Sequence, residues 1–400
     1  AKSRKARLSP RRYPANNDAM ETLTVDGNRL TLITEGPALL DALIALIEGA
    51  QASLRILYYI YADDESGRRV NEALIAAAAR GVDVTLIVDG FGSDRAGREH
   101  FFDPLATAGI AVCWFMPRFG RRYLLRNHQK LALADGKRIL IGGFNIANDY
   151  FAAASADAWR DLGLLLDGPA AGRIAPYFDA LREWVLRPDA ATRHLGRTLA
   201  QWSEPSGAVR WLIGGPTRRL SPWARAVRHD MRSARRIDII AGYFTPSPMM
   251  LRRLDRAARR DDRVRIVTAA RSDNNATIAA ARFTYRGLLR QGVRIFEYAP
   301  SKLHTKLYAI DDTVHVGSAN FDMRSLFINL ELMLRIEDAG FAAQARRYID
   351  GEVAHSNEIT PDGYRAATGW WQRIKQFVAY LIVGVADPTL SRGLNFGIDE

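Results

Sequence analysis

The sequence predicts an α/β protein made of two similar halves, each built around a largely parallel or mixed sheet. Two observations support this fold class. Segments with the apolar spacing of helices alternate with short runs of strand-forming residues along most of the chain. The order of these segments in the first half is repeated in the second, and a polar pattern that begins at His128 recurs at His304.

The composition is that of a folded protein with anionic partners. Of the 400 residues, 48% are hydrophobic and 25% are charged, which is typical of globular rather than disordered chains. This length exceeds what one hydrophobic core usually organises and therefore favours two domains. The formal net charge of +12 favours nucleic acid, anionic lipid or phosphorylated small molecules as partners, and charge alone does not choose among them.

Cysteine content and hydropathy exclude several classes. The single cysteine, Cys113, excludes a framework of intramolecular disulfides and a zinc site built from several cysteines. It lies in an apolar stretch, where a buried thiol is expected. No apolar run reaches the roughly eighteen residues that a membrane-spanning helix needs. We therefore expect a chain that is soluble or peripherally attached to a membrane.

The elements of the first half follow a basic segment, residues 1–25, which we interpret as a flexible arm. Residues 36–50 have helical apolar spacing, and residues 53–61 are rich in strand formers. Residues 67–81 again have a helical pattern, and residues 82–90 form a buried-strand pattern that closes with Asp-Gly.

The second half repeats this order. Residues 224–234 and 247–260 have helical patterns, and residues 236–246 and 264–270 have strand patterns. The repetition indicates a duplicated unit.

The boundary between the halves is predicted near residues 203–207, where turn formers interrupt the apolar pattern. This divides the chain after the arm into one domain over residues 26–205 and a second over residues 206–400. The two halves are then about equal in length.

The repeated pattern is His-x-Lys-x-x-x-x-Asp. It comprises His128, Lys130 and Asp135 in the first half, and His304, Lys306 and Asp311 in the second. If each pattern lies on a strand, its histidine and lysine share one face and can address one ligand, because residues two apart project to the same side. The aspartate then falls at the end of the strand, before a tight turn and a returning strand.

Small residues and an asparagine follow each returning strand: Gly142, Gly143 and Asn145 in the first half, and Gly317, Ser318 and Asn320 in the second. Each piece alone has an ordinary structural explanation. Asp-Gly is a common hairpin turn, a lone histidine in a strand is usually a satisfied polar side chain, and glycines often end strands. The occurrence of the whole pattern at equivalent places in both halves favours a functional role.

These residue types suit attack on a phosphodiester. Such a reaction needs a nucleophile, a proton donor for the leaving alkoxide, and cations for the phosphoryl oxygens. Two His-Lys pairs supply this set. The sequence shows no carboxylate cluster or His/Asp spacing typical of a metal site, so we expect a metal-independent enzyme without a cofactor.

A histidine nucleophile must also be held in the correct tautomer, usually by a carboxylate on the far ring nitrogen. Asp161 follows His128 in the first half, and Glu331 follows His304 in the second, at matching places in strand-like apolar runs. A carboxylate in such a run needs a partner. The alternative for each is an edge-strand carboxylate that faces solvent.

Together these residues resemble the phospholipase D superfamily, whose motif is His-x-Lys-x4-Asp followed by Gly-Gly or Gly-Ser and an asparagine. The resemblance spans about residues 28 to 390. The stretches at 58–93, 159–171 and 317–334 are similar to bacterial cardiolipin synthases of the type without N-terminal membrane spans. This resemblance implies two α/β/α halves related by pseudo-twofold symmetry, with mixed central sheets and a single active site between them.

The resemblance also implies residue roles. His128 would be the nucleophile that forms a phosphohistidine, and His304 the general acid and base. Asp161 and Glu331 would orient the histidines. The remaining motif residues divide into those expected to bind phosphate, Lys130, Lys306, Asn145, Asn320 and Ser318, and those expected to hold the motif strands together, Asp135 and Asp311. Gly143 lacks the hydroxyl that Ser318 has, which leaves the substrate asymmetry of the two sides open.

The implied reaction is phosphatidyl transfer that makes cardiolipin from phosphatidylglycerol, with phosphatidylglycerol or phosphatidylethanolamine as the second lipid. Hydrolysis to phosphatidic acid, and a metal-independent nuclease or phosphodiesterase of the same superfamily, are the alternatives, because the basic charge also suits a nucleic acid backbone. An inactive binding scaffold is disfavoured because both motifs retain histidine, lysine and aspartate. The implied location is the cytoplasmic face of the bacterial inner membrane, and the sequence predicts no oligomeric state.

The C-terminal stretch, residues 369–386, has the pattern of an interfacial amphipathic helix. Trp370, Ile374, Phe377 and Leu381 recur at helical spacing among basic residues, and the apolar run is too short to span a bilayer. The same spacing would serve a helix packed on its own domain. Residues 118–126 contain arginines that could meet anionic head groups or form a solvated loop.

Overall fold

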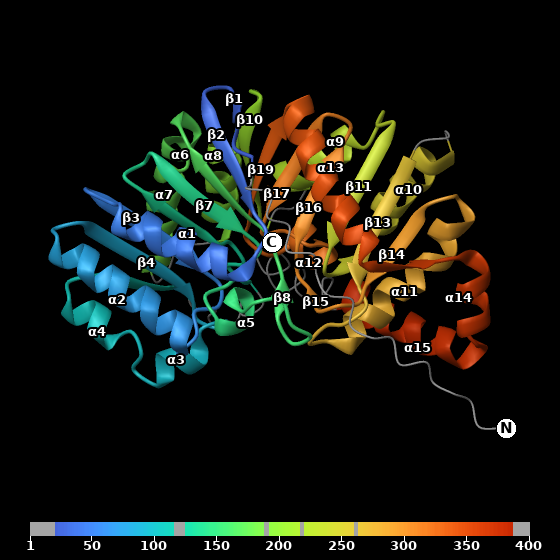
Figure 1. Ribbon diagram of the computed structural model, residues 1–400, viewed down its shortest axis with the longest axis horizontal. Coiled ribbons are helices and arrows are strands. Elements are labelled where there is room, and N and C mark those ends of the chain that lie inside the picture. Colours follow the sequence, from blue (N-terminus) through green and yellow to red (C-terminus); the bar gives the residue numbers. More distant parts are fainter. Residues whose placement is uncertain (1–20, 116–124, 188–191, 217–219, 260–262, 387–400) are drawn as a thin grey trace.

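The computed structural model describes residues 21–115, 125–187, 192–216, 220–259 and 263–386. Two α/β halves lie side by side, with the first half in blue to green and the second in yellow to red (Figure 1). The predicted fold class is confirmed, because each half is built on an eight-stranded mixed sheet.

The sheet of the first half has the order β1-β2-β9-β7-β6-β3-β4-β5. Only β3, β4 and β5 run parallel to one another, and the other neighbours are antiparallel. The strands are β1 (Leu23–Val25), β2 (Asn28–Ile33), β3 (Ser53–Tyr58), β4 (Asp83–Asp89), β5 (Ala111–Phe115), β6 (Leu131–Ala134), β7 (Arg138–Gly142) and β9 (Gly163–Asp167).

The sheet of the second half has the order β10-β19-β17-β16-β11-β13-β14-β20. The series β10-β19-β17-β16-β11-β13-β14 matches the series β2-β9-β7-β6-β3-β4-β5 of the first sheet, strand for strand and in direction. This match shows the repeat that the sequence predicts. The strands are β10 (Val209–Gly214), β11 (Arg236–Ala241), β13 (Arg263–Ala269), β14 (Arg294–Tyr298), β16 (Lys306–Ile310), β17 (Thr313–Gly317), β19 (Glu331–Glu337) and β20 (Ser356–Ile359).

Two short parallel pairs lie outside the large sheets. β12 (Phe244–Thr245) pairs with β18 (Phe321–Asp322), within the second half. β8 (Trp159–Arg160) pairs with β15 (Lys302–Leu303) and joins the two halves directly.

Helices cover the sheets. Those of the first half are α1 (Gly36–Glu48), α2 (Glu65–Ala79), α3 (Asp94–Arg98), α4 (Asp103–Thr107), α5 (Asn148–Phe151), α6 (Pro169–Arg173), α7 (Ala175–Leu186) and α8 (Thr192–Trp202). Those of the second are α9 (Pro222–Asp230), α10 (Pro248–Arg259), α11 (Asn275–Arg290), α12 (Met323–Phe327), α13 (Ala339–Ala354), α14 (Pro361–Ala367), α15 (Trp370–Tyr380) and the π-helical η1 (Leu381–Ala386). Several begin at side-chain caps; Asp64, for example, accepts a hydrogen bond from the Gly67 N–H.

One hydrophobic core is shared by the two halves. It contains inward-facing residues of both large sheets, such as Leu131 and Leu307, together with residues of α7, α8 and α13. Each half also has an outer core of its own, under α1 and α2 on one side and under α9, α10 and α11 on the other. The shared core holds the two sheets in a fixed relation, and the two motif histidines lie at this junction.

One predicted boundary changes. The arm predicted over residues 1–25 extends too far, because residues Leu23–Val25 form the edge strand β1, which pairs with β2. Residues 1–20 lie outside the described residues. The predicted connection at 203–207 lies between α8 and β10. Of the arginine-rich segment 118–126, residues 118–124 also lie outside the described residues.

Candidate active site

Each motif histidine lies just before its strand and is bound by the backbone of the opposite half. The sequence placed both histidines within strands, but β6 begins at Leu131 and β16 begins at Lys306. The backbone N–H of His128 donates to the Leu330 carbonyl at 2.9 Å, and that of His304 donates to the Arg160 carbonyl at 2.8 Å. Because their backbone N–H groups bond to the opposite half, the two histidines lie outside the strand pairing of their own sheets.

The carboxylate partners are crossed between the halves. His128 donates through Nδ1 to Glu331 Oε2 at 3.1 Å, and His304 donates through Nδ1 to Asp161 Oδ2 at 2.7 Å. The sequence placed each carboxylate in the half of the histidine that it follows, and the structure corrects this pairing. Because each Nδ1 is engaged, each Nε2 is left for substrate, and the ring centroids are 6.5 Å apart.

The two carboxylates differ in their surroundings. Burial raises the pKa of Asp161 to about 6, although Lys306 and the Leu162 N–H act in the opposite direction. Burial would also raise the pKa of Glu331, but His128 and Lys130 outweigh it, and the pKa is lowered overall. Glu331 therefore stays ionised over a wider pH range than Asp161.

Ser318 supports Glu331 and is not among the residues that line the cavity, so its predicted role in phosphate binding stays a prediction. Its hydroxyl donates to Glu331 Oε2 at 2.5 Å and accepts from the Leu332 N–H at 3.0 Å. Gly143 has no hydroxyl for a steric reason: a Cβ at this position would lie 2.6 Å from Asp161 Oδ1. The glycine thus makes room for the carboxylate that meets His304.

The two motif lysines are buried, and neither is among the residues that line the cavity. Lys130 Nζ donates to the His128 carbonyl at 2.5 Å, and Lys306 Nζ donates to the His304 carbonyl. Burial lowers the pKa of Lys130 to about 7 and that of Lys306 to about 8. Lys130 Nζ also lies 5.3 Å from the centre of the Tyr59 ring. Burial likewise lowers the pKa of both histidines, although Glu331 acts in the opposite direction on His128.

The two asparagines line the cavity with the histidines. Asn145 accepts from the Ile60 N–H at 3.1 Å and donates to the Tyr150 hydroxyl at 3.0 Å. Asn320 Oδ1 is buried and has no hydrogen-bond partner within the described part of the chain. An unpartnered buried amide oxygen beside the histidines is suited to a ligand donor.

The motif aspartates lie at the far end of their strands and fix the turns. Asp135 and Asp311 have positive φ angles of 53° and 46°. The Asp135 carboxylate accepts the N–H groups of Gln51, Ala52 and Ser53, which enter β3, and Asp311 accepts those of Arg235 and Arg236, which enter β11. Neither aspartate lines the cavity.

The cavity has a volume of about 670 Å³ and is lined by residues of both halves. The sequence did not predict most of the residues that line it. The aromatic lining residues are Tyr59, Phe91, Tyr150, Trp159 and Tyr243, and the charged ones are Arg126, Asp273, Asp322 and Arg324. The one available signal was the aromatic residues that follow β3 and β11, where parallel strands end and ligands commonly bind.

Aromatic rings pack edge-on around both histidines. The centroids of Tyr150, Trp159 and Tyr243 lie 5.4, 5.2 and 5.9 Å from that of His304. Tyr59 lies 5.1 Å from His128. These contacts help to hold the imidazole rings in place.

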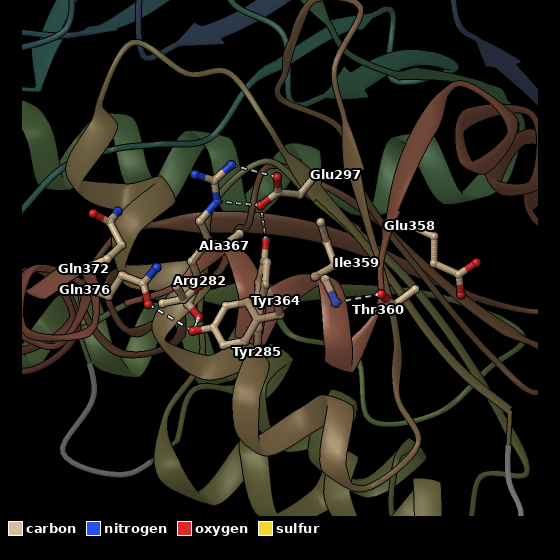
Figure 2. Close-up of a pocket in the computed structure, with 12 residues that line it drawn as sticks. Arg282, Tyr285, Glu297, Glu358, Ile359, Thr360, Tyr364, Ala367, Gln372 and Gln376 are labelled. Atoms are coloured by element: carbon tan, nitrogen blue, oxygen red, sulfur yellow. Dashed lines mark hydrogen bonds and ion pairs between the residues drawn. The ribbon is translucent and has the colours of Figure 1, made fainter. Parts of the chain in front are cut away.

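A second hollow, of about 280 Å³, lies under α14 and α15 and shares no residue with the histidine cavity. Figure 2 shows two of its charged groups paired: Arg282 donates to both oxygens of Glu297, and Tyr285 donates to the same carboxylate. The third charged residue of the lining, Glu358, accepts from Arg294. The Tyr364 hydroxyl donates to Gln376 across the hollow. These saturated groups leave the histidine cavity as the candidate site. Among the described residues, no group of three or more His, Cys, Asp or Glu side chains is placed to hold a metal ion.

Comparisons with known proteins point to one family. The family model described as "Cardiolipin synthase, PLD-like domain" matches residues 43–181 and 227–352. The chain is 30% identical over 369 residues to cardiolipin synthase B of Escherichia coli K12, a match that covers 89% of this chain and 87% of that protein. It is 31% identical over 344 residues to cardiolipin synthase A of Pseudomonas putida, covering 84% and 70% of the two chains.

A solved structure shares the fold. The crystal structure of phosphatidylserine synthase from Haemophilus influenzae superposes with a TM-score of 0.71 at 14% sequence identity, over 93% of this chain and 96% of that one. At this identity the likeness concerns the arrangement of the two halves.

Proposed function

The chain belongs to the family of cardiolipin synthases with phospholipase D-like domains, and from this premise we infer that it is a phosphatidyltransferase that makes cardiolipin from phosphatidylglycerol. One observation carries the proposal to specific atoms: two histidines face one cavity, and each has its Nδ1 engaged by a carboxylate of the opposite half. This leaves two Nε2 atoms for the two sides of one phosphorus centre.

In the first proposed step, His128 Nε2 attacks the phosphorus of one phosphatidylglycerol. The bond between phosphorus and the glycerol oxygen breaks, and the His304–Asp161 pair gives the leaving glycerol a proton from Nε2. The product is phosphatidyl-histidine. Ionised Glu331, which accepts from both His128 and Ser318, stabilises the positive charge that the substituted imidazole acquires.

In the second step, His304 takes the proton of the hydroxyl group of a second lipid, whose oxygen attacks phosphorus and releases His128. Attack by phosphatidylglycerol gives cardiolipin, and attack by water gives phosphatidic acid. Lys130, Lys306, Asn145 and Asn320 are proposed to stabilise the phosphoryl oxygens in both steps. The residues present supply the nucleophile, the proton donor and the cations, and we propose that no metal cofactor takes part.

Peripheral membrane binding belongs to the same proposal. Within the described residues, no helix is both long and apolar enough to cross a membrane. Of nine exposed large apolar side chains in that part of the chain, seven lie on α15 and η1: Trp370, Trp371, Ile374, Phe377, Val378, Leu381 and Ile382. An interfacial helix has this character. We name this set the apolar ridge.

The apolar ridge runs to the mouth of the candidate site. Ile382 and Val383 line the cavity, and so does Phe91 of the first half, which is 59% exposed. Beside the start of the ridge, Arg286, Arg290, Arg365 and Arg373 line a basic recess suited to anionic head groups. A membrane on this face would deliver lipid head groups to the histidines. We propose the cytoplasmic face of the bacterial inner membrane as the location.

The test is mass spectrometry of lipids after the purified chain acts, in EDTA, on phosphatidylglycerol vesicles with and without phosphatidylethanolamine. Cardiolipin with released glycerol supports the proposal. Release of ethanolamine from the mixed vesicles would identify phosphatidylethanolamine as the phosphatidyl donor, with phosphatidylglycerol as the acceptor. Phosphatidic acid alone indicates a hydrolase. No lipid product would contradict the proposal and favour a nuclease or another phosphodiesterase.

A further inference from the structure

We propose that Tyr243, Asp273, Asn274 and Thr277 form a subsite for the adjacent hydroxyl groups of a glycerol head group, beside His304. The inference rests on the proposed phosphatidyl transfer and deepens it, because it names the part of the cavity that selects the alcohol. All four residues line the cavity and come from the second half.

The centre of the subsite is a carboxylate held in position. Tyr243 follows β11, Asp273 follows β13, and these neighbouring strands are parallel, so that both residues lie at the same sheet edge. The Tyr243 hydroxyl donates to Asp273 Oδ1 at 2.6 Å, and the Ser272 hydroxyl donates to the same oxygen at 2.9 Å. The carboxylate therefore cannot rotate freely, and its Oδ2 keeps its capacity to accept from a ligand.

The neighbouring groups complement a diol. Asn274 caps α11: its Oδ1 accepts the Ala276 N–H at 3.0 Å, which directs its hydrogen-bond donors, on Nδ2, elsewhere. Thr277 donates its hydroxyl hydrogen to the Asn274 carbonyl at 2.7 Å and retains acceptor capacity. A hydroxyl group both donates and accepts, so a diol can use the carboxylate and the amide together. An ammonium group only donates and cannot use the amide hydrogens.

The opposite side of the cavity has a different character. The carboxylate of Asp89, at the end of β4, is occupied by hydrogen bonds from the backbone: it accepts the N–H groups of Phe91, Gly92 and Asn127. The Arg126 guanidinium lies 4.1 Å from the centre of the Phe91 ring. The cavity wall here presents an arginine over an aromatic ring.

Arg324 belongs to this basic side as well. Arg126 and Arg324 line the same cavity as Tyr59 and His128, and the Tyr59 ring contacts His128. Burial raises the pKa of the Tyr59 hydroxyl to about 12, and both arginines act to lower it. The other carboxylate in the lining, Asp322, accepts the Ser325 N–H as the cap of α12. The cavity thus has a basic side near His128 and a side near His304 where Asp273 faces the ligand.

This difference between the two sides of the cavity agrees with the two steps of the proposed phosphatidyl transfer. The leaving glycerol and the incoming hydroxyl both exchange a proton with the general acid and base, so the alcohol must bind beside that histidine. Tyr243 connects the subsite to His304, because its ring packs edge-on against the imidazole. The phosphate and acyl chains then extend toward the basic side and the apolar ridge. The polarity agrees with the proposed assignment of the proton transfers to His304.

The experiment measures how the phosphatidyl group partitions between two alcohols in one tube. The full chain acts on phosphatidylglycerol vesicles in EDTA with equal concentrations of deuterated glycerol and 1-propanol, and mass spectrometry gives the ratio of deuterated phosphatidylglycerol to phosphatidylpropanol. Because both products form in the same sample, the ratio does not depend on how much of a variant is folded.

We expect the wild-type chain to prefer glycerol. Asp273→Asn and Tyr243→Phe should each lower the glycerol-to-propanol ratio at least about tenfold, as expected for loss of a hydrogen bond to a charged group. Asp41→Asn, a matched change at a carboxylate that is 74% exposed on α1, should leave the ratio unchanged. An unchanged ratio in Asp273→Asn would overturn the subsite, whatever happens to the total rate.

Two further outcomes are decisive. If ethanolamine replaces 1-propanol and the wild-type chain prefers it to glycerol, Asp273 recognises an ammonium group and the diol assignment is wrong. If the wild-type chain forms cardiolipin but shows no preference between glycerol and 1-propanol, the subsite fails while the proposed function stands. If it transfers phosphatidyl groups to no alcohol, the proposed function fails first and the subsite with it.

Discussion

His128 and Glu331 are 203 positions apart in the sequence, and the imidazole Nδ1 of one lies 3.1 Å from the carboxylate of the other. The pair joins the two halves of the protein, as does its counterpart between His304 and Asp161. Each half therefore contributes one histidine to its own motif and one carboxylate to the motif of the other half.

Replacement of either histidine should abolish turnover. His128→Ala and His304→Ala each remove one of the two Nε2 atoms that the cavity presents, and we expect transfer to fall at least about a thousandfold, as in other sites whose members act as a unit. Circular dichroism should show an intact fold. Substantial cardiolipin synthesis by either variant would contradict a shared site.

The crossed carboxylates should separate the two steps. Glu331→Gln removes the charge behind His128, so rapid-quench experiments should show slower formation of the phosphatidyl-histidine by about a hundredfold or more. Glu337→Gln, at the exposed end of the same strand, is the control. Tandem mass spectrometry should locate the adduct on His128. An adduct on His304 would reverse the assigned roles.

A glycine should be required at position 143, because Asp161 leaves no room for a side chain there. Gly143→Ala introduces a Cβ that would lie 2.6 Å from Asp161 Oδ1, and we expect the free energy of unfolding to fall by about 1–3 kcal/mol, with loss of activity. In Gly351→Ala, the new Cβ meets nothing within 4 Å in α13, so this variant should be stabilised by about 0.5–1 kcal/mol. Urea titrations measure both changes. A neutral Gly143→Ala would show that Asp161 can move aside.

Activity should decline as pH rises through the range in which the lysines lose their charge. Burial lowers the pKa of Lys130 to about 7 and that of Lys306 to about 8, and each lysine is charged below its value. The kcat/KM profile, which reports the free enzyme, should therefore fall on the alkaline side. Lys130→Arg keeps its charge and should move the decline to higher pH. An unmoved decline would assign it to the proton of the His304–Asp161 pair.

The apolar ridge should control vesicle binding. Trp370 is 72% exposed, and Trp370→Ser should weaken binding to anionic vesicles by roughly tenfold or more, since burial of one large apolar side chain contributes about 1.5–3 kcal/mol. Leu186→Ser, at a residue 55% exposed at the end of α7, is the control. Sedimentation with sucrose-loaded vesicles measures both. Equal binding of Trp370→Ser and the wild-type chain would contradict a membrane-binding ridge.

Local pattern and repetition in the sequence predict the fold class and the motif residues, because strand and helix periodicity depends on near neighbours. They could not predict which carboxylate meets which histidine. That pairing depends on the exchange of backbone between the halves at Leu330 and Arg160, which no local spacing encodes. The contact of Ser318 with Glu331 depends on the same kind of long-range arrangement, because it forms only when β17 and β19 lie side by side.

The crossed carboxylates have a consequence for protein synthesis. A chain released by the ribosome before Glu331 has a complete first motif but no carboxylate behind His128, and a fragment that begins after residue 202 has His304 without Asp161. Each fragment therefore lacks one of the two histidine–carboxylate pairs, and neither holds the full set of groups that the proposed transfer needs.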